Sequence, residues 1–537
     1  MNYYHGQLYS AKLEMLREMM NWEIERDRFE VLCQLDKLFS EWRGQLPNFR
    51  DIFYPQEIEC ILSEVVTKRK KNIENRQRQR IVEFVARSGY KDEPEVDESG
   101  KPLLHRTTPI HLAAGHQFFH RETVVRRLFE IYDKFDVNYV DEDGLSHFHV
   151  ACHLGIVDVV EKFLEVGQNP NLAHPKLNDP PLHYALRGGH NQVAKLLIRS
   201  GADPNWANAR GMTPLHGIGW RGDVESARML LESGIDKCRP VQIDARDELG
   251  RSALFWALYY NNKSVTQFLL RNGADPNLAG KNGLTPVHIV SRICMFRDNE
   301  LTALFFTTID EIGKTLQIDA CDTLGRTPLQ WAVANFSSNV VAILLDRGAD
   351  LSSFVFPTER HFDMIIHSRE FVFGNRSKIM VTIRAMDTVQ LLEERGYELD
   401  RSDALMIMKC FSEYEMFEQP RDVERTWMDD EKFVTKMKSV MMNANLSLYD
   451  LFQLRPKEAE KLVTKMDYYR FAHRSNIPAD IELHLCELMS RRFFLSWALE
   501  PLMVLTHCRL PLLCCDMIIE NLMNQDLYHI CLAATRL

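Results

Sequence analysis

The middle of the chain repeats a short block of apolar residues that follows a threonine, serine or proline. The first copy, Thr108 to Ala114, reads Thr-Pro-Ile-His-Leu-Ala-Ala, and altered copies begin at residues 146, 180, 213, 252, 285 and 327. A second block follows most copies, with apolar residues three and four positions apart, as in Val193 to Ile198, and then a glycine. This spacing is typical of helices, so each copy is predicted to begin a helix pair.

The residues at the ends of these blocks explain why helices begin and end there. Threonine or serine caps the first helix, and proline in the first helical turn loses no hydrogen bond. The glycine after the second block supplies the left-handed residue that ends a helix. The turn Gly201 to Asn205 returns unchanged as Gly273 to Asn277. One helix pair cannot bury its apolar face alone, so the pairs are expected to stack.

A period near 33 residues with a Thr-Pro-Leu-His-x-Ala block resembles the ankyrin repeat. The resemblance covers residues 105–352. It implies an all-α fold, an ankyrin-repeat solenoid of about seven repeats with short β-hairpin turns, flanked by N-terminal helices and a C-terminal helical domain. The predicted units are 105–142, 143–176, 177–210, 211–248, 249–282, 283–324 and 325–354.

Helical patterns also flank the repeats. The stretch Val389 to Gly396 has the features of one more second helix with its glycine, which predicts an eighth, capping unit. The predicted segments outside the repeats are 1–90, an N-terminal helical region with a basic run; 91–104, an acidic linker; 355–445, an irregular region with a degenerate repeat; and 446–537, a C-terminal helical domain.

The C-terminal domain contains Leu510-Pro511, an isoleucine-rich helix, then Asp526-Leu527 and Ile530-Cys531. This order resembles the F-box, a helical module that docks on the Skp-type adaptor of cullin-based ubiquitin ligases. Ankyrin repeats followed by a truncated F-box are the arrangement of the PRANC proteins of poxviruses, certain intracellular bacteria and parasitoid wasps. The alternative is a buried helical cap. The resemblance implies an adaptor-binding face made of Leu510, Pro511, Ile518, Ile519, Leu522, Leu527 and Ile530.

Composition and charge exclude several classes of protein. A chain of 537 residues is too long for one core, and its net charge of -10 argues against binding nucleic acid along its whole surface. No apolar run is long enough to cross a bilayer, no signal-peptide core is present, and the twelve cysteines lack paired spacing. We therefore expect a cytoplasmic protein with reduced thiols and no membrane segment.

The basic run from Lys68 to Arg80 leaves three interpretations open. A solvated helix face is favoured, because Arg76, Arg78 and Arg80 alternate with glutamines and so wrap around a helix. The alternatives are a nuclear-import or anionic-surface patch, which adds a nuclear location, and a nucleic-acid-binding segment.

No motif predicts a catalytic residue, a cofactor or a metal. Stacked repeats hold the histidines of the repeated block in separate layers, so rings hydrogen-bonded inside each repeat are favoured over metal ligands. Gly313-Lys314-Thr315 resembles the end of a phosphate loop, but Thr308 occupies the position of its required earlier glycine. Cysteines 508, 514 and 515 lack the spacing of zinc ligands. We expect a protein that is not an enzyme. The repeated histidines are His111, His149, His183, His216 and His288.

The hairpin tips of the repeats are the candidate sites for a target protein. Tip residues contribute little to packing, so they are free to form a binding surface. The alternative for each of them is an ordinary polar residue that faces solvent. The candidates are Glu142, Asp143, Arg210, Met212, Arg246, Glu248, Arg251, Lys281, Asn282 and Arg326.

Two functions follow from the sequence. In the first, the chain is a protein–protein interaction adaptor, whose repeats capture an unidentified protein while the F-box-like module recruits a Skp/cullin ubiquitin ligase. In the second, the repeats form a binding scaffold or a competitive inhibitor of a signalling protein, and the C-terminal helices are a structural cap.

Overall fold

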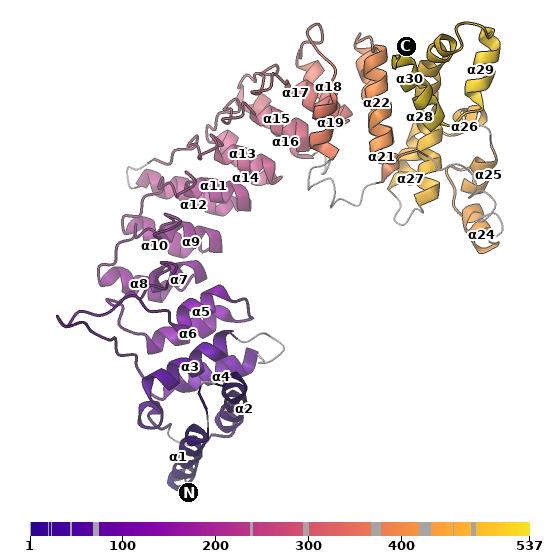
Figure 1. Ribbon diagram of the computed structural model, residues 1–537. Coiled ribbons are helices and arrows are strands. Elements are labelled where there is room, and N and C mark those ends of the chain that lie inside the picture. The colour runs from indigo at the N-terminus through magenta and orange to yellow at the C-terminus, as the bar shows by residue number, and fades with distance from the viewer. Residues whose placement is uncertain are drawn as a thin grey trace. The chain divides into compact units, whose positions relative to one another are not determined.

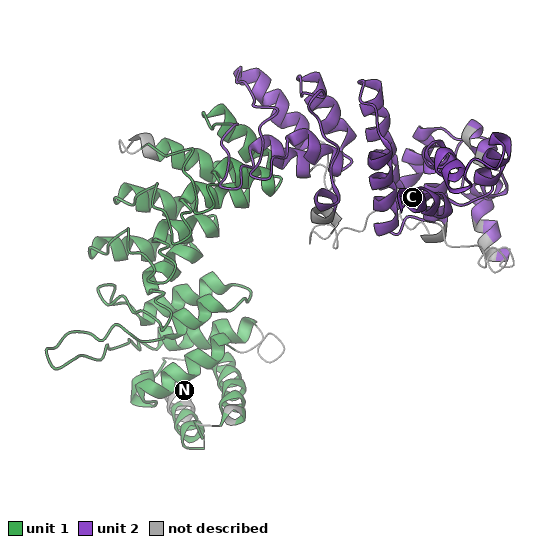
Figure 2. Ribbon diagram, turned by 45° about the horizontal axis from the view of Figure 1, so that its top comes forward, with its two compact units in different colours: residues 1–275 green, residues 276–537 purple. Residues whose placement is uncertain are grey.

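The computed structural model describes residues 2–19, 21–22, 24–42, 46–67, 75–236, 240–293, 300–366, 377–417, 431–454, 456–473 and 479–536. The chain divides into two compact units, residues 1–275 and 276–537, coloured green and purple in Figure 2. Within the described ranges, extended residues pair only as isolated bridges, such as Val140 with Ser146. The prediction of an all-α fold is confirmed.

Five helix pairs of the first unit lie at the predicted repeat positions and stack in chain order (Figure 1). First helices pack on first helices from α5 to α13, and second helices pack on second helices from α8 to α14. The pairs are α5 (Pro109–Gly115) and α6 (Arg121–Ile131); α7 (His147–Leu154) and α8 (Val157–Glu165); α9 (Pro181–Gly188) and α10 (Asn191–Arg199); α11 (Pro214–Arg221) and α12 (Val224–Asp236); α13 (Ala253–Tyr259) and α14 (Lys263–Arg271).

The N-terminal helices extend this stack by one more pair. Helix α3 (Pro55–Thr67) packs on α5, and α4 (Asn75–Arg87) packs on α6, so the two occupy the places of a first and a second repeat helix. Gly89 follows α4 with a positive φ of 82°, as a repeat glycine does. Before this pair lie α1 (Asn2–Glu18), α2 (Glu25–Glu41) and the short 3₁₀ helix η1 (Phe49–Asp51).

The second unit begins with two further repeat pairs and a third that departs from the pattern. Helix α19 packs on α17, and α21 packs on α18, so α19 and α21 take the positions of an eighth repeat. Gly396 follows α21 with a φ of 90°. These helices are α15 (Pro286–Ile293), α16 (Glu300–Ile312), α17 (Pro328–Ala334), α18 (Ser338–Asp346), α19 (Glu359–Ile366) and α21 (Lys378–Glu394).

The rest of the second unit is built around α28 (Ala479–Leu505), a long helix that packs against α21, α22, α26, α29 and α30. Its buried face includes Leu485, Cys486 and Phe494. The helices around it are α22 (Arg401–Glu413), α24 (Glu431–Ser439), α25 (Leu448–Gln453), α26 (Pro456–Leu462), α27 (Lys465–Ala472), α29 (Leu512–Glu520), α30 (Asn524–Ala533) and η2 (Ala534–Arg536).

Two glycines with positive φ lie in different surroundings and should respond differently to alanine. A Cβ at Gly201 (φ 100°) meets nothing within 4 Å, whereas a Cβ at Gly222 (φ 85°) lies 2.5 Å from Oδ1 of Asn262. The Asn262 amide donates to the carbonyls of Gly219 and Trp220 at 2.7 and 3.0 Å, so it ties the fifth repeat to the end of α11.

We expect Gly201→Ala to lower the free energy of unfolding by about 1 kcal/mol, the backbone strain alone. Gly222→Ala should lower it by about 2–3 kcal/mol, because it also displaces the Asn262 hydrogen bonds. Urea unfolding of both variants measures the difference. An equal loss would contradict the proposed role of Asn262.

Candidate protein-binding surfaces

The repeated histidines link each first helix to the hairpin that follows it. In the first repeat, Nδ1 of His111 accepts from the backbone N–H of Thr108 at 3.1 Å, and Nε2 lies 3.2 Å from the carbonyl of Tyr139. In the second, the same atoms of His149 pair with Ser146 at 3.3 Å and Leu172 at 2.7 Å. A carbonyl only accepts, so Nε2 carries the proton and each ring is neutral. Burial lowers the pKa of His111 to about 4 and that of His149 to about 4.

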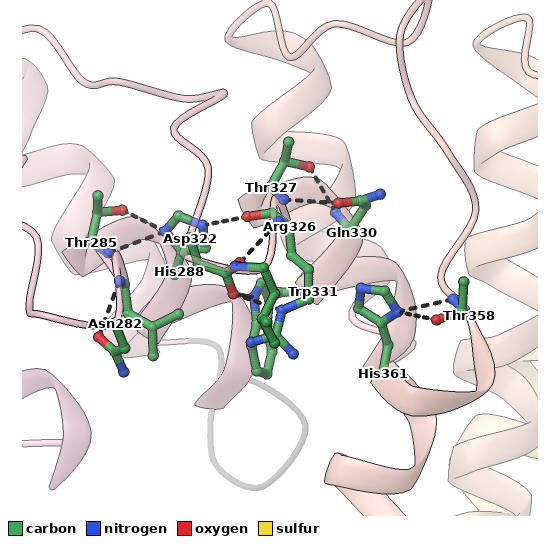
Figure 3. A network of polar contacts seen from close by, with 12 residues as sticks. Asn282, Thr285, His288, Asp322, Arg326, Thr327, Gln330, Trp331, Thr358 and His361 are labelled. Atoms are coloured by element: carbon green, nitrogen blue, oxygen red, sulfur yellow. Dashed lines mark hydrogen bonds and ion pairs between the residues drawn. The ribbon is translucent and has the colours of Figure 1, made fainter.

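The same links continue in the second unit, where they also include a glutamine (Figure 3). His288 accepts from the N–H of Thr285 and pairs with the carbonyl of Arg326 at 3.0 Å. In the next repeat, Oε1 of Gln330 accepts from Thr327, and its Nε2 donates to the carbonyl of Val355. His361 caps α19 in the same way, through Thr358 at 2.9 Å. His111, His149, His288 and Gln330 therefore act as structural connectors, whereas His361 caps its own helix.

The hairpins before the first helices are closed by an Asp or Asn side chain. Oδ1 of Asn208 accepts from the N–H groups of Arg210 and Met212, and Oδ1 of Asp247 accepts from those of Leu249 and Arg251. Two backbone donors on one oxygen hold each turn in a fixed shape. The side chains of Arg210 and Glu248, which lie within these turns, are therefore exposed on a backbone of fixed shape.

The structure places most predicted tip residues at the surface but turns two of them inward. Arg251 donates to Asp247 at 2.8 Å and lies 4.2 Å above the ring of Trp256. Arg326 repeats this arrangement with Asp322 and Trp331 (Figure 3). These two arginines stabilise their own hairpins. Met212 is half-buried, and the exposed tips are Glu142, Asp143, Arg210, Arg246, Glu248, Lys281 and Asn282.

A cleft of about 700 Å³ lies between the third and fourth repeats of the first unit. Lys176, Arg187, Arg210 and Arg221 line it, together with the single carboxylate of Asp179. A smaller cleft of about 500 Å³ lies beside it, toward the second repeat, and shares the Lys176 and Arg187 walls. The sequence pattern indicates the hairpin tips but not a cleft, because a cleft depends on how the side chains of two neighbouring repeats fill the space between them.

A second candidate surface lies on α29, in the C-terminal domain. Ile519 and Leu527 are 2% and 0% exposed, so the domain itself covers them. Leu512, Leu513 and Met517 are 55%, 76% and 66% exposed on the same helix, beside the partly exposed Ile518. Among the other residues of the predicted face, Pro511 is exposed, whereas Leu510, Leu522 and Ile530 are half-buried. The exposed face of α29 therefore consists largely of residues that the F-box resemblance did not single out.

A buried polar network fixes the position of α29. Nη2 of Arg491 on α28 donates to the carbonyls of Ile519 and Glu520 at 3.1 Å each, which caps the C-terminal end of α29. Nη1 of Arg491 contacts Glu487 at 3.2 Å, and Glu487 accepts from the N–H of Asn524 at 2.7 Å. Burial lowers the pKa of Arg491.

The basic run at the N-terminus contributes little to an exposed charged patch in its described part. Arg78 is 1% exposed and donates to the carbonyl of Val65, and its guanidinium lies over the ring of Phe118. Arg80 pairs with Asp36 at 2.8 Å. Arg76 is exposed. The lysines and arginine at positions 68–71 lie outside the described residues, and the nuclear interpretation depends on them.

Comparison with known proteins identifies the repeats. A family model described as ankyrin repeats (3 copies) matches residues 166–241, 182–280 and 254–354. This chain therefore contains ankyrin repeats, which support a role in protein–protein interaction. Among the described residues, no helix is both long and apolar enough to span a membrane.

The similar curated proteins combine the repeats with different larger chains. The human transient receptor potential cation channel subfamily A member 1 is 27% identical over 267 residues, which cover 49% of this chain and 22% of the channel. Mouse Rabankyrin-5 is 25% identical over 52% of this chain and 26% of its own length. Palmitoyltransferase AKR1 of Lachancea kluyveri is 28% identical over 36% of this chain and 26% of the enzyme. This chain thus spans about a quarter of each relative, and its lack of enzyme activity stays a prediction.

Proposed function

We propose that this chain is an adaptor whose ankyrin repeats capture a target protein and whose α29 face recruits a Skp-type adaptor of a cullin-based ubiquitin ligase. The exposed apolar face of α29 is the observation that supports this most directly. We place the activity in the cytoplasm, with a nuclear location as the alternative. A protein target, rather than nucleic acid or a membrane, agrees with the ankyrin repeats and with the net charge of -10.

The exposed face of α29 is costly to leave in water. Leu512, Leu513 and Met517 expose more than half of their surfaces within one helix of nine residues. A contiguous apolar surface of this kind marks a protein-interaction site in soluble proteins. The order Leu-Pro, isoleucine-rich helix, Asp-Leu and Ile-Cys supplies the partner, because it resembles the element of an F-box that contacts the Skp-type adaptor.

We expect Leu513→Asp with Met517→Asp to weaken binding to a purified Skp-type adaptor by at least about thirtyfold, because two apolar anchors become charged at the centre of the contact. Both side chains face solvent, so the melting temperature should stay within about 2 °C of that of the unmodified chain. Isothermal titration calorimetry on the full chain measures the affinity. Leu324→Asp, at an exposed apolar hairpin position of the same unit, is the matched control and should bind normally.

A second pair of changes tests the entry to α29. Pro511 is the N-cap residue of the helix and is exposed, and Leu510 is half-buried beside it. Leu510→Ala with Pro511→Ala should abolish adaptor binding and leave target capture by the repeats intact. Unchanged adaptor affinity in both double variants would reject the F-box interpretation.

The alternative is a binding scaffold or competitive inhibitor of a signalling protein, with the C-terminal helices as a structural cap. The burial of Ile519 and Leu527 inside the domain favours this function. It predicts that the unmodified chain binds its target through the repeats but does not bind the adaptor in calorimetry.

A further inference from the structure

One wall of the cleft between the third and fourth repeats contains a glycine at a position where the other repeats have a side chain. In the fourth repeat, the residue that follows the histidine position is Gly217. In the other six repeats the corresponding residue has a side chain, namely Leu112, Val150, Tyr184, Trp256, Ile289 and Trp331. Gly217 lies inside α11, where glycine is unfavourable for helix formation. A Cβ placed there meets nothing within 4 Å. Local stability therefore does not account for this glycine, and its effect is an open space in the cleft.

The walls of this cleft combine apolar surface with unbalanced positive charge. Trp220 is 49% exposed, and Leu177 and Met212 add further apolar lining. Four cations line the cleft against one carboxylate, in a chain whose net charge is -10. Lys176 pairs with Asp143, and Arg187 pairs with Asp179. The structure shows no carboxylate partner for Arg210 or Arg221 among the residues it describes. The Arg221 guanidinium donates a hydrogen bond to the carbonyl of Arg187.

We propose that the Gly217 cleft, lined by Lys176, Arg187, Arg210, Gly217, Trp220 and Arg221, binds an extended acidic segment of the target protein. A large apolar side chain of that segment enters the space above Gly217, and its carboxylates pair with Arg210 and Arg221. This inference rests on the proposed capture of a target protein by the repeats and names the chemistry of the captured segment.

The apolar lining favours a peptide over a nucleic acid. Two guanidinium groups that have no carboxylate partner among the described residues line the same cleft as the exposed indole of Trp220, and this combination matches a large apolar side chain flanked by carboxylates. A nucleic-acid site tracks a phosphate backbone with a long basic groove. The cleft instead has apolar walls at Leu177, Met212 and Trp220.

The test begins with a random peptide library of about twelve residues, displayed on phage and selected on the full chain. We expect the recovered peptides to be enriched in Asp and Glu around an aromatic residue or leucine. One such peptide is then synthesised, and its affinity is measured by fluorescence polarisation. Arg210→Glu with Arg221→Glu should weaken binding at least about tenfold, since like charges replace two ion pairs. Arg199→Glu, at an exposed position of α10 outside both the cleft lining and the hairpin tips, is the matched control and should change it less than twofold.

Gly217→Leu separates binding from folding. Leucine fills the space and should also weaken peptide binding at least about tenfold, yet it should keep or raise the melting temperature, because leucine favours a helix more than glycine does. Recovery of no peptide, peptides without acidic residues, or unchanged binding in Gly217→Leu would overturn the proposal. So would preferential binding of a single-stranded oligonucleotide that depends on Arg221. Adaptor binding at α29 should be unaffected in these variants, so failure at the cleft is distinguishable from failure of the ligase-recruiting function.

Discussion

Lowering the pH from 7 to 5 is expected to destabilise the repeats of the first unit by several kcal/mol. His111 and His149 are buried and neutral, and burial lowers the pKa of each to about 4. In the unfolded chain a histidine has a pKa of about 6.5. Between these two values the unfolded state binds a proton that the folded state does not, so stability falls as the pH decreases through 6.5 and continues to fall until about 4. Each of these two histidines should remove about 2 kcal/mol between pH 7 and 5.

Further buried histidines of the first unit also lower the stability of the folded state as the pH decreases. Burial lowers the pKa of His183 and of His216, and it holds that of His147 well below its usual value. Protection factors for amide hydrogen exchange in α7 and α9, measured on the full chain at pH 7, 6 and 5, report the effect. Constant protection over this range would contradict neutral, buried rings.

The seventh repeat suggests the matched control for this prediction. Gln330 makes both hydrogen bonds of the repeated histidine and does not titrate. His149→Gln should therefore keep the links to Ser146 and Leu172 while reducing the loss between pH 7 and 5 by about 2 kcal/mol. An unchanged pH dependence in this variant would show that His149 does not bind the proton.

Replacing Arg491 by alanine should disrupt the packing of α29 and α30 on α28. The side chains of Arg491 and Glu487 are 5% and 6% exposed, so the substitution leaves a carboxylate buried without its cation. It also removes the donors to the carbonyls of Ile519 and Glu520. Breaking a buried pair in this way costs about 3–5 kcal/mol.

Hydrogen exchange in α29 and α30 measures this loss directly, and adaptor binding should fall with it. Arg492→Ala is the matched control, because Arg492 is the next residue on α28 and is exposed. We expect that variant to behave as the unmodified chain does. Normal protection of α29 in Arg491→Ala would mean that apolar packing alone positions the helix.

Local signals were enough to predict the repeats. A Thr-Pro pair, a histidine three residues after the threonine and a glycine after the second helix act within a few residues of one another. Their effects on helix capping are therefore visible in the sequence, as at Thr108, Thr213 and Thr285. The eighth pair was predicted from Val389–Gly396, but its first helix was missed, although Thr358 and His361 carry the same capping signal in altered form.

The sequence by itself determined the class of this protein, because helix capping and the period near 33 residues depend on neighbours along the chain. Only the tertiary structure decided which side chains are available to partners. It turned Arg251 and Arg326 onto their own tryptophans, and it covered Ile519 while leaving Leu513 exposed. It also placed Gly217, which has no side chain, in the wall of a cleft between repeats. For Ile519 and the Gly217 cleft, the physical reason is that exposure depends on residues about one repeat or more away in the sequence. Arg251 and Arg326 instead contact tryptophans of their own repeats, and only the folded turn between hairpin and helix brings each pair together.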